Sequence, residues 1–568
     1  MVCSVWCRIA VAFVVGVLAA GLSPGCLAAD QPDHYGIRQV RVINERIAAG
    51  WKDAGLEPSP LATDGEWCRR VFLDLIGRVP TLTELQAFTV DSSASKKADL
   101  VARLLGDDYV DEYARNFTDV WTTVLIGRDA TNANVNRSGM RQYLRRGFSK
   151  NIPYDRFMEE LVTASGANTN RRGVAGFNGA TNFLSGKMEE MGVANGVQAT
   201  AKTAQVFLGL QVQCTQCHNH PFNKGKQNQF WEFNAFFRQT AALRRRDGTE
   251  DVQWIELVDQ DFPGEGGDPE EAELYYELRN GLMKVAYPVF VDGTEVPTSG
   301  FLPGTMADGT PYGVNRRQEL ARLIKTSPLF PSAIANRMWS HFLGYGFTHP
   351  MDDVGDHNPP SHPELLESLA KAFQEQSYDL KELARWIVLS RPYALSSRTT
   401  PGNKSDDPAL GERPKFTHFY LRQMQAEQLY ESLLTATEVD ETRVGEDAAK
   451  KKDRWLGQFV IAFGTDEGDD TTTFNGSIPQ VLMMFNGDLV REATSTGKGG
   501  FLDKVASSGL SPTQKIDTLY LAALARKPSA KELKTANALL SARKGDVAGA
   551  LQDVWWAVLN SNEFIINH

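Results

Sequence analysis

Residues 72–85 read Phe72-Leu-Asp-Leu-Ile-Gly-Arg-Val-Pro-Thr-Leu-Thr-Glu-Leu85, and they predict two helices joined by a tight turn. The apolar residues up to Ile76 recur at helical spacing, and Gly77 and Pro80 interrupt the pattern. Thr81 and Glu84 then have the spacing of a capping box, in which each side chain satisfies the other residue's backbone amide. The stretch therefore predicts a helical hairpin.

The same pattern recurs near the other end of the chain, in Tyr520-Leu-Ala-Ala-Leu-Ala-Arg-Lys-Pro-Ser-Ala-Lys-Glu-Leu533. The arginine, the proline, the capping box and the apolar positions match those of the first stretch. A second pair follows, because Asp119-Val-Trp121 resembles Asp553-Val-Trp555. We therefore expect residues 66–125 and 515–562 to form similar helical units. Two units are too few for a solenoid, which needs at least three repeats.

Amphipathic segments with helical spacing fill most of the remaining chain, whereas residues 244–312 are rich in turns and carry short β-like runs. The chain has 568 residues, which is enough for several domains. We expect a mainly α, multi-helical, two-lobed protein with a small β-containing insertion between the lobes. The predicted domains are a helical domain over residues 30–243, the insertion over residues 244–312 and a second helical domain over residues 313–568.

Residues 1–29 have the layout of a secretory signal peptide, with one charge at Arg8, an apolar run and a small-residue exit before Ala29. We therefore expect an exported protein, located in the periplasm or at the cell surface. The residues before Cys26 loosely resemble a bacterial lipobox, so a lipoprotein anchored at Cys26 is the alternative. No later segment reaches the ~18 apolar residues of a membrane span, so we expect no transmembrane helix in the mature chain.

Charge and cysteine content argue against two further classes of protein. Removing residues 1–29 deletes Arg8 and no acidic residue, which takes the net charge from −10 to −11 and argues against nucleic acid as a partner. Only Cys68, Cys214 and Cys217 then remain, which excludes a disulfide-built scaffold. Cys68 lies on an amphipathic segment, and we expect it to be a small core residue.

The chemistry of the chain is expected in Gln211-Val-Gln-Cys-Thr-Gln-Cys-His-Asn-His-Pro-Phe222. Cys214-x-x-Cys217-His218 is the attachment pattern of haem c, in which both sulfurs bond the porphyrin and the histidine ligates the iron. We expect both cysteines on the first turn of a helix, with their sulfurs facing an apolar cavity. Three other interpretations stay open: a small disulfide, a buried structural thiol cluster, or zinc or another divalent metal bound with help from His218 and His220.

A second group of metal-capable side chains follows in the C-terminal half and consists of Asp352, Asp353 and His357. These residues either bind a cation or form salt bridges, and they do not have the spacing of a calcium loop. If the two halves of the chain pack across one cleft, the carboxylates would also suit metal-dependent hydrolysis together with His218 and His220. No Ser-His-Asp or P-loop pattern is present, so the sequence does not decide whether the protein is an enzyme.

Taken together, these motifs resemble the planctomycete-specific cytochrome-like proteins of the DUF1549/DUF1553 type. The residues that carry the resemblance span nearly the whole mature chain: Arg70–Gly77 with Pro80-Thr81, Cys214–Phe222 with Phe236-Phe237, Asn336-Arg337 with Trp339, Asp352-Asp353, Pro360–Leu366, Ala426-Glu427, Asn560–Phe564 and Asn567-His568. The resemblance implies a cytochrome-c-like domain of unknown function followed by a planctomycete-specific domain, and it brings no settled activity. Many relatives carry a further cytochrome domain that is not present in these residues, so any redox partner is a separate protein.

The sequence thus favours an exported protein that carries covalently attached haem c and acts in electron transfer or another redox role. The candidates for the sixth iron ligand are Met188, Met191, Met338 and His341. The alternative is a non-enzymatic cell-surface or periplasmic binding protein for a polysaccharide or a protein partner, with the two motif cysteines bridged.

Overall fold

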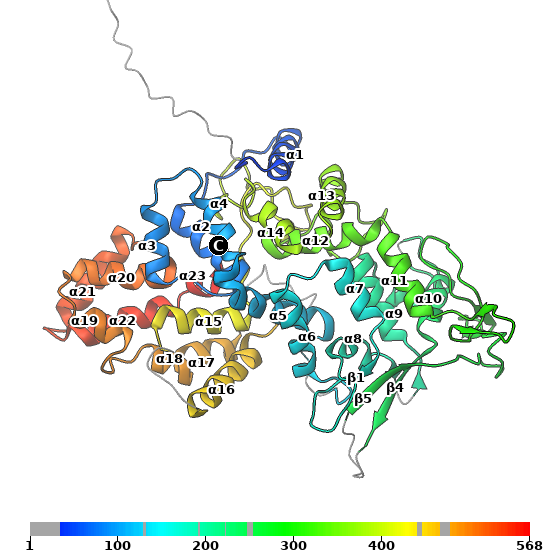
Figure 1. Ribbon diagram of the computed structural model, residues 1–568. Helices are drawn as coiled ribbons and strands as arrows, with labels where there is room; N and C mark the ends of the chain where they lie inside the picture. The colour runs from blue at the N-terminus through cyan, green and yellow to red at the C-terminus, as the bar shows by residue number, and fades with distance from the viewer. Residues whose placement is uncertain are drawn as a thin grey trace, which may run out of the picture.

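The computed structural model describes residues 34–128, 132–190, 193–221, 223–246, 254–439, 446–465 and 477–568. The predicted signal peptide, Cys26, Met191 and Phe222 lie outside these residues. The described chain is mainly α, with sheets of only two or three strands, and Figure 1 shows two helical lobes. The predicted fold class is therefore confirmed.

The first hydrophobic core takes its residues, apart from Ala525, from the chain between Val40 and Tyr420. It combines residues of both predicted helical domains, and the boundaries at 243 and 313 stay predictions. The α-helices around this core are α1 (Arg38–Ala54), α2 (Asp64–Ile76), α3 (Leu82–Val90), α4 (Lys96–Leu104), α5 (Val110–Ile126), α6 (Arg137–Ser149), α7 (Tyr154–Val162), α8 (Asn182–Ser185), α9 (Val197–Thr203), α10 (Gln227–Asn234), α11 (Arg316–Thr326), α12 (Leu329–Leu343), α13 (Pro363–Glu375) and α14 (Leu380–Val388).

The second core joins Leu73 and Val79 to residues between Met424 and Ile565. Its helices are α15 (Ala426–Thr437), α16 (Glu446–Phe463), α17 (Ile478–Asn486), α18 (Asp488–Ala493), α19 (Phe501–Ser507), α20 (Pro512–Leu524), α21 (Ala530–Ala542), α22 (Val547–Leu559) and α23 (Asn562–Ile565). Among the described residues, no helix is both long and apolar enough to cross a bilayer.

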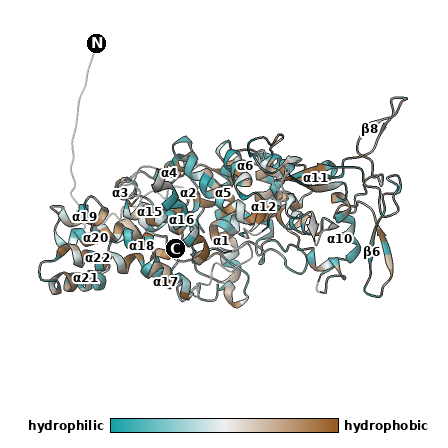
Figure 2. Cartoon of the chain, turned by 90° about the horizontal axis from the view of Figure 1, so that it is seen from below, coloured by the Kyte–Doolittle hydropathy of each residue, from teal (hydrophilic) through white to brown (hydrophobic). Residues whose placement is uncertain are grey.

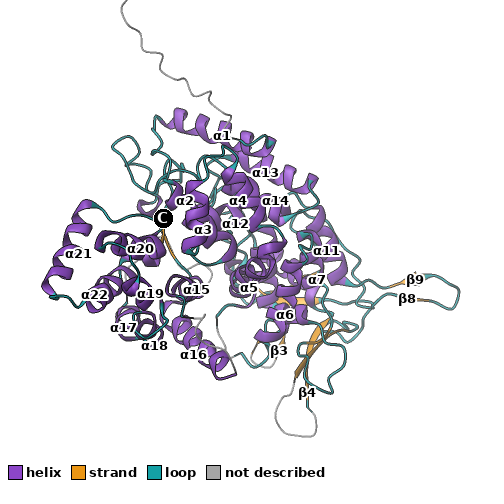
Figure 3. Ribbon diagram, turned by 60° about the vertical axis from the view of Figure 1, so that its left-hand side comes forward, coloured by secondary structure: helices purple, strands orange, loops and turns teal. Residues whose placement is uncertain are grey.

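The strands form a small sheet and several two-stranded ribbons. β1 (Gly166–Ala167), β5 (Trp254–Asp259) and β4 (Thr240–Arg245) make an antiparallel sheet in that order. The ribbons are β2 (Glu189–Glu190) with β3 (Val193–Ala194), β6 (Leu274–Glu277) with β7 (Met283–Ala286), β8 (Gly304–Thr305) with β9 (Pro311–Tyr312), and β10 (Arg422–Gln423) with β11 (Ile566–Asn567). The insertion thus contains strands as predicted. Its β6 and β8 ribbons project from the end of the molecule opposite α19–α22 (Figure 2), and Figure 3 shows the β8–β9 ribbon from another side.

The two stretches that match in sequence also match in their local contacts. Thr81 and Glu84 form the predicted capping box at the start of α3, and Ser529 and Glu532 form the same box at the start of α21. In the first stretch, Arg78 donates two hydrogen bonds to Glu84 at 2.9 and 3.0 Å.

In the second stretch, Arg526 donates two hydrogen bonds to Glu532 at 3.0 and 2.9 Å. The guanidinium of Arg78 lies 5.5 Å from the Phe72 ring centroid, and that of Arg526 lies 5.6 Å from the Tyr520 ring centroid. The similarity between the two stretches therefore includes an arginine that is held by the glutamate of the capping box and by an aromatic ring.

Replacing Glu532 with glutamine is expected to lower the melting temperature at neutral pH, because glutamine keeps the cap but removes the charge that Arg526 pairs with. Hydrogen bonding to Arg526 lowers the pKa of Glu532 to about 2, from an unfolded value of about 4.3. A lowered carboxyl pKa stabilises the fold above the unfolded pKa, and this contribution is lost as the pH falls toward 2. Melting curves of both proteins should therefore converge between about pH 4.5 and 2, and a constant difference would contradict this account.

The two cores meet at Asp74, a buried carboxylate on α2. Asp74 accepts hydrogen bonds from Arg422 Nη2 at 2.6 Å, Asn567 Nδ2 at 2.7 Å and the Tyr393 hydroxyl at 2.7 Å. A buried charge needs such pairing, because an uncompensated one is strongly destabilising. Asp74 therefore ties α2 to β10 and β11, which come from distant parts of the sequence.

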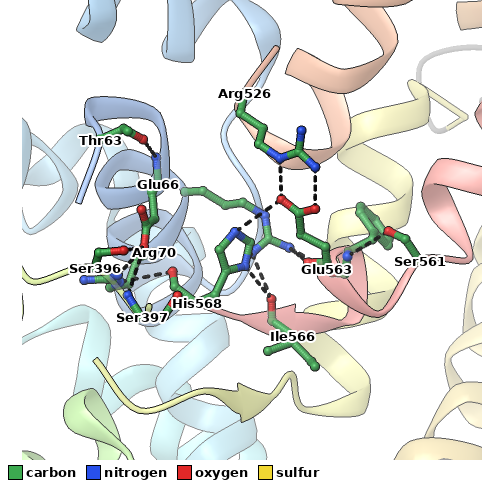
Figure 4. A network of polar contacts seen from close by, with 12 residues as sticks. Thr63, Glu66, Arg70, Ser396, Ser397, Arg526, Ser561, Glu563, Ile566 and His568 are labelled. Carbon is green, nitrogen blue, oxygen red and sulfur yellow. Dashed lines mark hydrogen bonds and ion pairs between the residues drawn. The ribbon is translucent and has the colours of Figure 1, made fainter. Parts of the chain in front are cut away.

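The arginines that precede Asp74 bind the backbone near residue 568. Arg69 donates to the carbonyls of Ile566 at 3.0 Å and Phe564 at 2.8 Å, and Arg70 donates to the His568 carbonyl at 3.1 Å. Figure 4 shows this region, with Arg526 and Glu563 facing each other beside His568. The junction is thus built from charged side chains of α2 and backbone carbonyls of residues 564–568.

Candidate functional site

The motif loop, residues 211–221, is held in place by contacts of the residues that precede its cysteines. A single turn of π-helix, Ala204–Leu208, continues α9 and ends at Gly209, whose φ of 66° suits glycine. A Cβ atom at Gly209 would lie 3.2 Å from a Val354 side-chain carbon, and the Val354 amide donates to the Gly209 carbonyl at 2.8 Å. The loop between α12 and α13 therefore holds the start of the motif.

Cys214 lies on a short 3-10 turn, Gln213–Gln216, and Cys217 follows the turn as its C-cap. Thr215 is buried beneath this turn, and its hydroxyl donates to the Val212 carbonyl at 2.6 Å. The Gln216 carbonyl accepts hydrogen bonds from the side chains of Gln227 at 3.1 Å and Trp231 at 3.0 Å, both on α10. The backbone of the motif is thus fixed from below by α10.

Cys214 and Cys217 are both exposed, and neither forms a disulfide. Cys68 is also unpaired but fully buried, as predicted, and burial raises the pKa of its thiol. Of the three cysteines that the structure describes, the two in the motif are therefore the ones accessible to a reactant.

The surroundings of the cysteines differ from the expected ones. We predicted the first turn of an α-helix with the sulfurs facing an apolar cavity, but the turn is a 3-10 turn and the sulfurs face solvent. Cys214 within the turn and Cys217 directly after it are both exposed, whereas Thr215 between them is buried. The buried-thiol interpretation is therefore wrong.

The two histidines of the motif are held in opposite tautomers. His218 Nδ1 lies 2.7 Å from the Asn219 carbonyl, which only accepts, so Nδ1 carries the proton and Nε2 keeps its lone pair. His220 Nδ1 accepts from the Asn223 amide at 3.1 Å, so its Nδ1 is the unprotonated nitrogen. A metal binds the ring nitrogen that carries no proton, and the hydrogen bond at Nδ1 decides which nitrogen that is. Nε2 of His218 can therefore bind a metal, whereas Nε2 of His220 carries the proton.

A cavity of about 630 Å³, here called the loop cavity, lies beside the motif. Its apolar wall comes from both sides of the motif and from the insertion: Leu210, Val212, Phe230, Phe233 and Val291. The lining also includes Asp353–His357 from the loop between α12 and α13. The two motif cysteines and His218 are not among the residues that line this cavity.

The loop cavity does bring the two halves of the chain together, as the hydrolysis hypothesis required. The His220 and His357 ring centroids are 6.1 Å apart, and Lys224 pairs with Asp356 across the opening. His357 Nε2 lies 3.0 Å from Asp353 Oδ1, and a Cβ atom at Gly355 would lie 2.7 Å from the His357 ring. Both halves thus contribute side chains to the loop cavity, and His357 lines it whereas His220 does not.

The second predicted cluster, which consists of Asp352, Asp353 and His357, does not line one common cavity. Asp353 and His357 face the loop cavity, whereas Asp352 is buried and accepts from Gln205 Nε2 at 2.6 Å and Gln211 Nε2 at 2.9 Å. In the part of the chain that the structure describes, no three His, Cys, Asp or Glu side chains converge as ligands of one metal ion. The two glutamines that hold Asp352 were not predicted, because isolated amides have no sequence signature.

None of the described candidates for a sixth iron ligand lines the loop cavity. Met188, Met338 and His341 do not line the loop cavity, and Met338 and His341 line another cavity instead. Met191 is outside the described residues.

Two family models match the chain, in an order that agrees with the resemblance. Residues 42–242 match the model described as PSCyt2, a protein of unknown function (DUF1549), and residues 316–540 match the model described as PSD1, a protein of unknown function (DUF1553). The first match contains the motif loop, and the second contains Asp352, Asp353 and His357. Comparison with curated proteins and with solved structures gave no match.

Proposed function

We propose that this chain, which belongs to the proteins that join a DUF1549 domain to a DUF1553 domain, is an exported c-type haem protein that transfers electrons. The proposal rests on the motif, which presents two free thiols beside an imidazole that can bind a metal. Cys214 and Cys217 would hold the porphyrin through thioether bonds, and His218 Nε2 would ligate the iron. The group would supply one-electron redox chemistry.

The observation that carries the proposal is the hydrogen bond from His218 Nδ1 to the Asn219 carbonyl. A histidine that ligates a metal through Nε2 commonly donates its Nδ1 proton to a backbone carbonyl, which fixes both the tautomer and the ring orientation. His218 has this arrangement in the folded chain. No neighbouring side chain has to move to create it.

The arrangement of the donors favours haem over zinc. Zinc needs about four donors that converge within ~2.0–2.3 Å of one point, and no three suitable side chains converge in the described residues. Haem c spreads its attachment points, because the thiols bond the porphyrin edge and the imidazole ligates the iron at its centre. The exposed thiols also suit attachment, since a solvent-facing sulfur is open to reaction.

Exposure of the motif favours electron transfer to a separate redox partner protein. Cys214, Cys217 and His218 all lie on the surface, where a second protein can approach them. The charged residues Lys224 and Asp356 are also exposed near the motif, and charges at such a rim influence the rate of encounter.

His218→Ala and His220→Ala are expected to behave differently, although the two residues are neighbours in the same motif. The precursor is expressed in a host that exports it and attaches haem, and its visible spectrum is recorded. His218→Ala should shift or weaken the Soret band, because the iron loses its Nε2 ligand. His220→Ala is the matched control and should keep the wild-type spectrum. Equal spectral changes in both variants would contradict the assignment of His218.

A further inference from the structure

The β6–β7 ribbon of the insertion projects beside α10 (Figure 2), and two side chains of α10 connect it to the motif loop. Gln227 Nε2 donates to the Gln216 carbonyl at 3.1 Å and to the Glu277 carbonyl at 2.9 Å, so one nitrogen holds both backbones. Trp231 also donates to the Gln216 carbonyl, and its ring stacks on Tyr276 with 5.9 Å between the centroids. The ribbon is therefore fixed next to the motif turn.

One face of the ribbon, here called the inner face, packs against α10. Successive side chains of a strand point to opposite faces, and residues that pair directly share a face. Leu274, Tyr276 and Ala286 point to the inner face, where they are buried and form a small core with Trp231. Lys284 pairs with Tyr276 and so belongs to the same face. These contacts hold the ribbon on the molecule.

The opposite face, here called the outer face, carries aromatic and apolar side chains. Tyr275 pairs with Val285, and Glu277 pairs with Met283. The outer face is open, because Met283 is 54% exposed and Val285 is 36% exposed, and Tyr287 continues it beyond β7. No third strand pairs with the ribbon in the described chain. Apolar side chains that adjoin on an exposed face are typical of interaction sites.

The outer face also carries two carboxylates. Glu273 accepts hydrogen bonds from the hydroxyls of Tyr275 at 2.5 Å and Tyr287 at 2.8 Å, and these bonds lower the pKa of its carboxyl. Glu277 is exposed and adds a second negative charge.

The chain around the outer face has the same sign of charge. Residues 264–287 contain six acidic and two basic residues. Of the two basic residues, Lys284 belongs to the inner face and Arg279 lies in the turn between the strands. A positively charged protein would therefore be attracted to the outer face, and a negatively charged one would be repelled.

We infer that the outer face of the β6–β7 ribbon docks a redox partner protein with a lysine-rich surface. The inference rests on the proposed haem function, because the ribbon is held beside the motif that would carry the haem. Complementary charges steer two such proteins together, and the apolar side chains supply the contact at the centre. Electron-transfer complexes commonly bury less than ~1,200 Å² in total, so a small face is sufficient.

The test titrates the full exported protein with oxidised mitochondrial cytochrome c, a small basic redox protein, in a calorimeter. The ionic strength is about 0.01 M, where charges act over ~30 Å. Cytochrome c with acetylated lysines is the comparator, because acetylation removes the positive charge. Glu273→Gln with Glu277→Gln removes both carboxylates of the outer face at similar volume. Glu367→Gln with Glu375→Gln removes two exposed carboxylates of α13 and is the matched control.

We expect the wild type and the α13 control to bind native cytochrome c equally, and the outer-face double variant to bind it roughly tenfold more weakly. Val285→Thr should also weaken binding, because it places a hydroxyl among the apolar side chains without changing the charge. The acetylated probe should not bind. A carbodiimide, which joins carboxylates to amines in contact, should link Glu273 or Glu277 to lysines of the native probe.

The inference is overturned if native cytochrome c does not bind, if the acetylated probe binds as tightly, or if the outer-face double variant binds like the α13 control. Binding should persist in the Cys214→Ala, Cys217→Ala variant, because the ribbon itself contains no attachment residue. A wild type that binds the probe but carries no haem would contradict the haem proposal alone. A wild type that carries haem but does not bind the probe would contradict the docking surface alone.

Discussion

Replacing Cys214 and Cys217 together with alanine is expected to abolish the covalent haem of the exported protein completely. Each thioether bond needs one of these sulfurs, and the only other cysteine in the described chain, Cys68, is buried in the first core. On a denaturing gel stained for haem, the wild type should give a band at the mass of the mature chain, and the double variant should give none. The Soret absorbance of the purified protein should disappear in parallel.

Cys68→Ala is the matched control, because it also removes a thiol but leaves the motif intact. Its stained band and its Soret absorbance should equal those of the wild type. An exported wild-type protein without a stained band would contradict the haem proposal and favour a disulfide between the motif cysteines. A double variant that keeps its stained band would contradict the assigned attachment residues.

Asp74→Ala is expected to lower the free energy of unfolding by about 3–5 kcal/mol, the usual cost of leaving a buried charge unpaired. The substitution removes the carboxylate that accepts from Arg422, Tyr393 and Asn567, and the Arg422 guanidinium stays buried. The second helical hairpin has Ala522 at the equivalent position, so the hairpin itself does not need a carboxylate there. The loss should therefore come from the junction between the two cores.

Urea denaturation followed by circular dichroism measures this change. Asp553→Ala is the control, because Asp553 pairs with Arg543 on the surface, and such pairs contribute about 0–1 kcal/mol. If Asp74→Ala and Asp553→Ala destabilise the protein equally, Asp74 does not hold the junction.

The features predicted most accurately from the sequence are those that depend on a few consecutive residues. The hairpin at residues 72–85 depends on Gly77, Pro80 and a capping box within a few positions, and the structure reproduces it at both ends of the chain. The Cys-x-x-Cys-His spacing is equally local, but the exposure of its two thiols differs from the apolar cavity that we predicted.

Features that depend on distant contacts were not predictable in the same way. Asp352 and Asp353 are neighbours in sequence, but amides that precede Asp352 by 147 and 141 positions turn it toward a different cavity from Asp353. The position of the motif sulfurs also depends on α10, which holds the turn from below. Hydrophobic periodicity contains no information about either contact.

The contacts between α2 and residues 563–568 affect the order in which the polypeptide can mature. Arg69 and Arg70 bind carbonyls that lie 494 to 498 positions later in the chain. At ~5–20 residues per second, synthesis of that interval lasts on the order of 25–100 s. During this time the late acceptors of two arginines that are buried in the final fold have not yet been made, although Arg70 also donates to the carbonyls of Tyr393 and Leu395. The contacts of Arg69 and Arg70 with residues 563–568 therefore cannot form until those residues have been made.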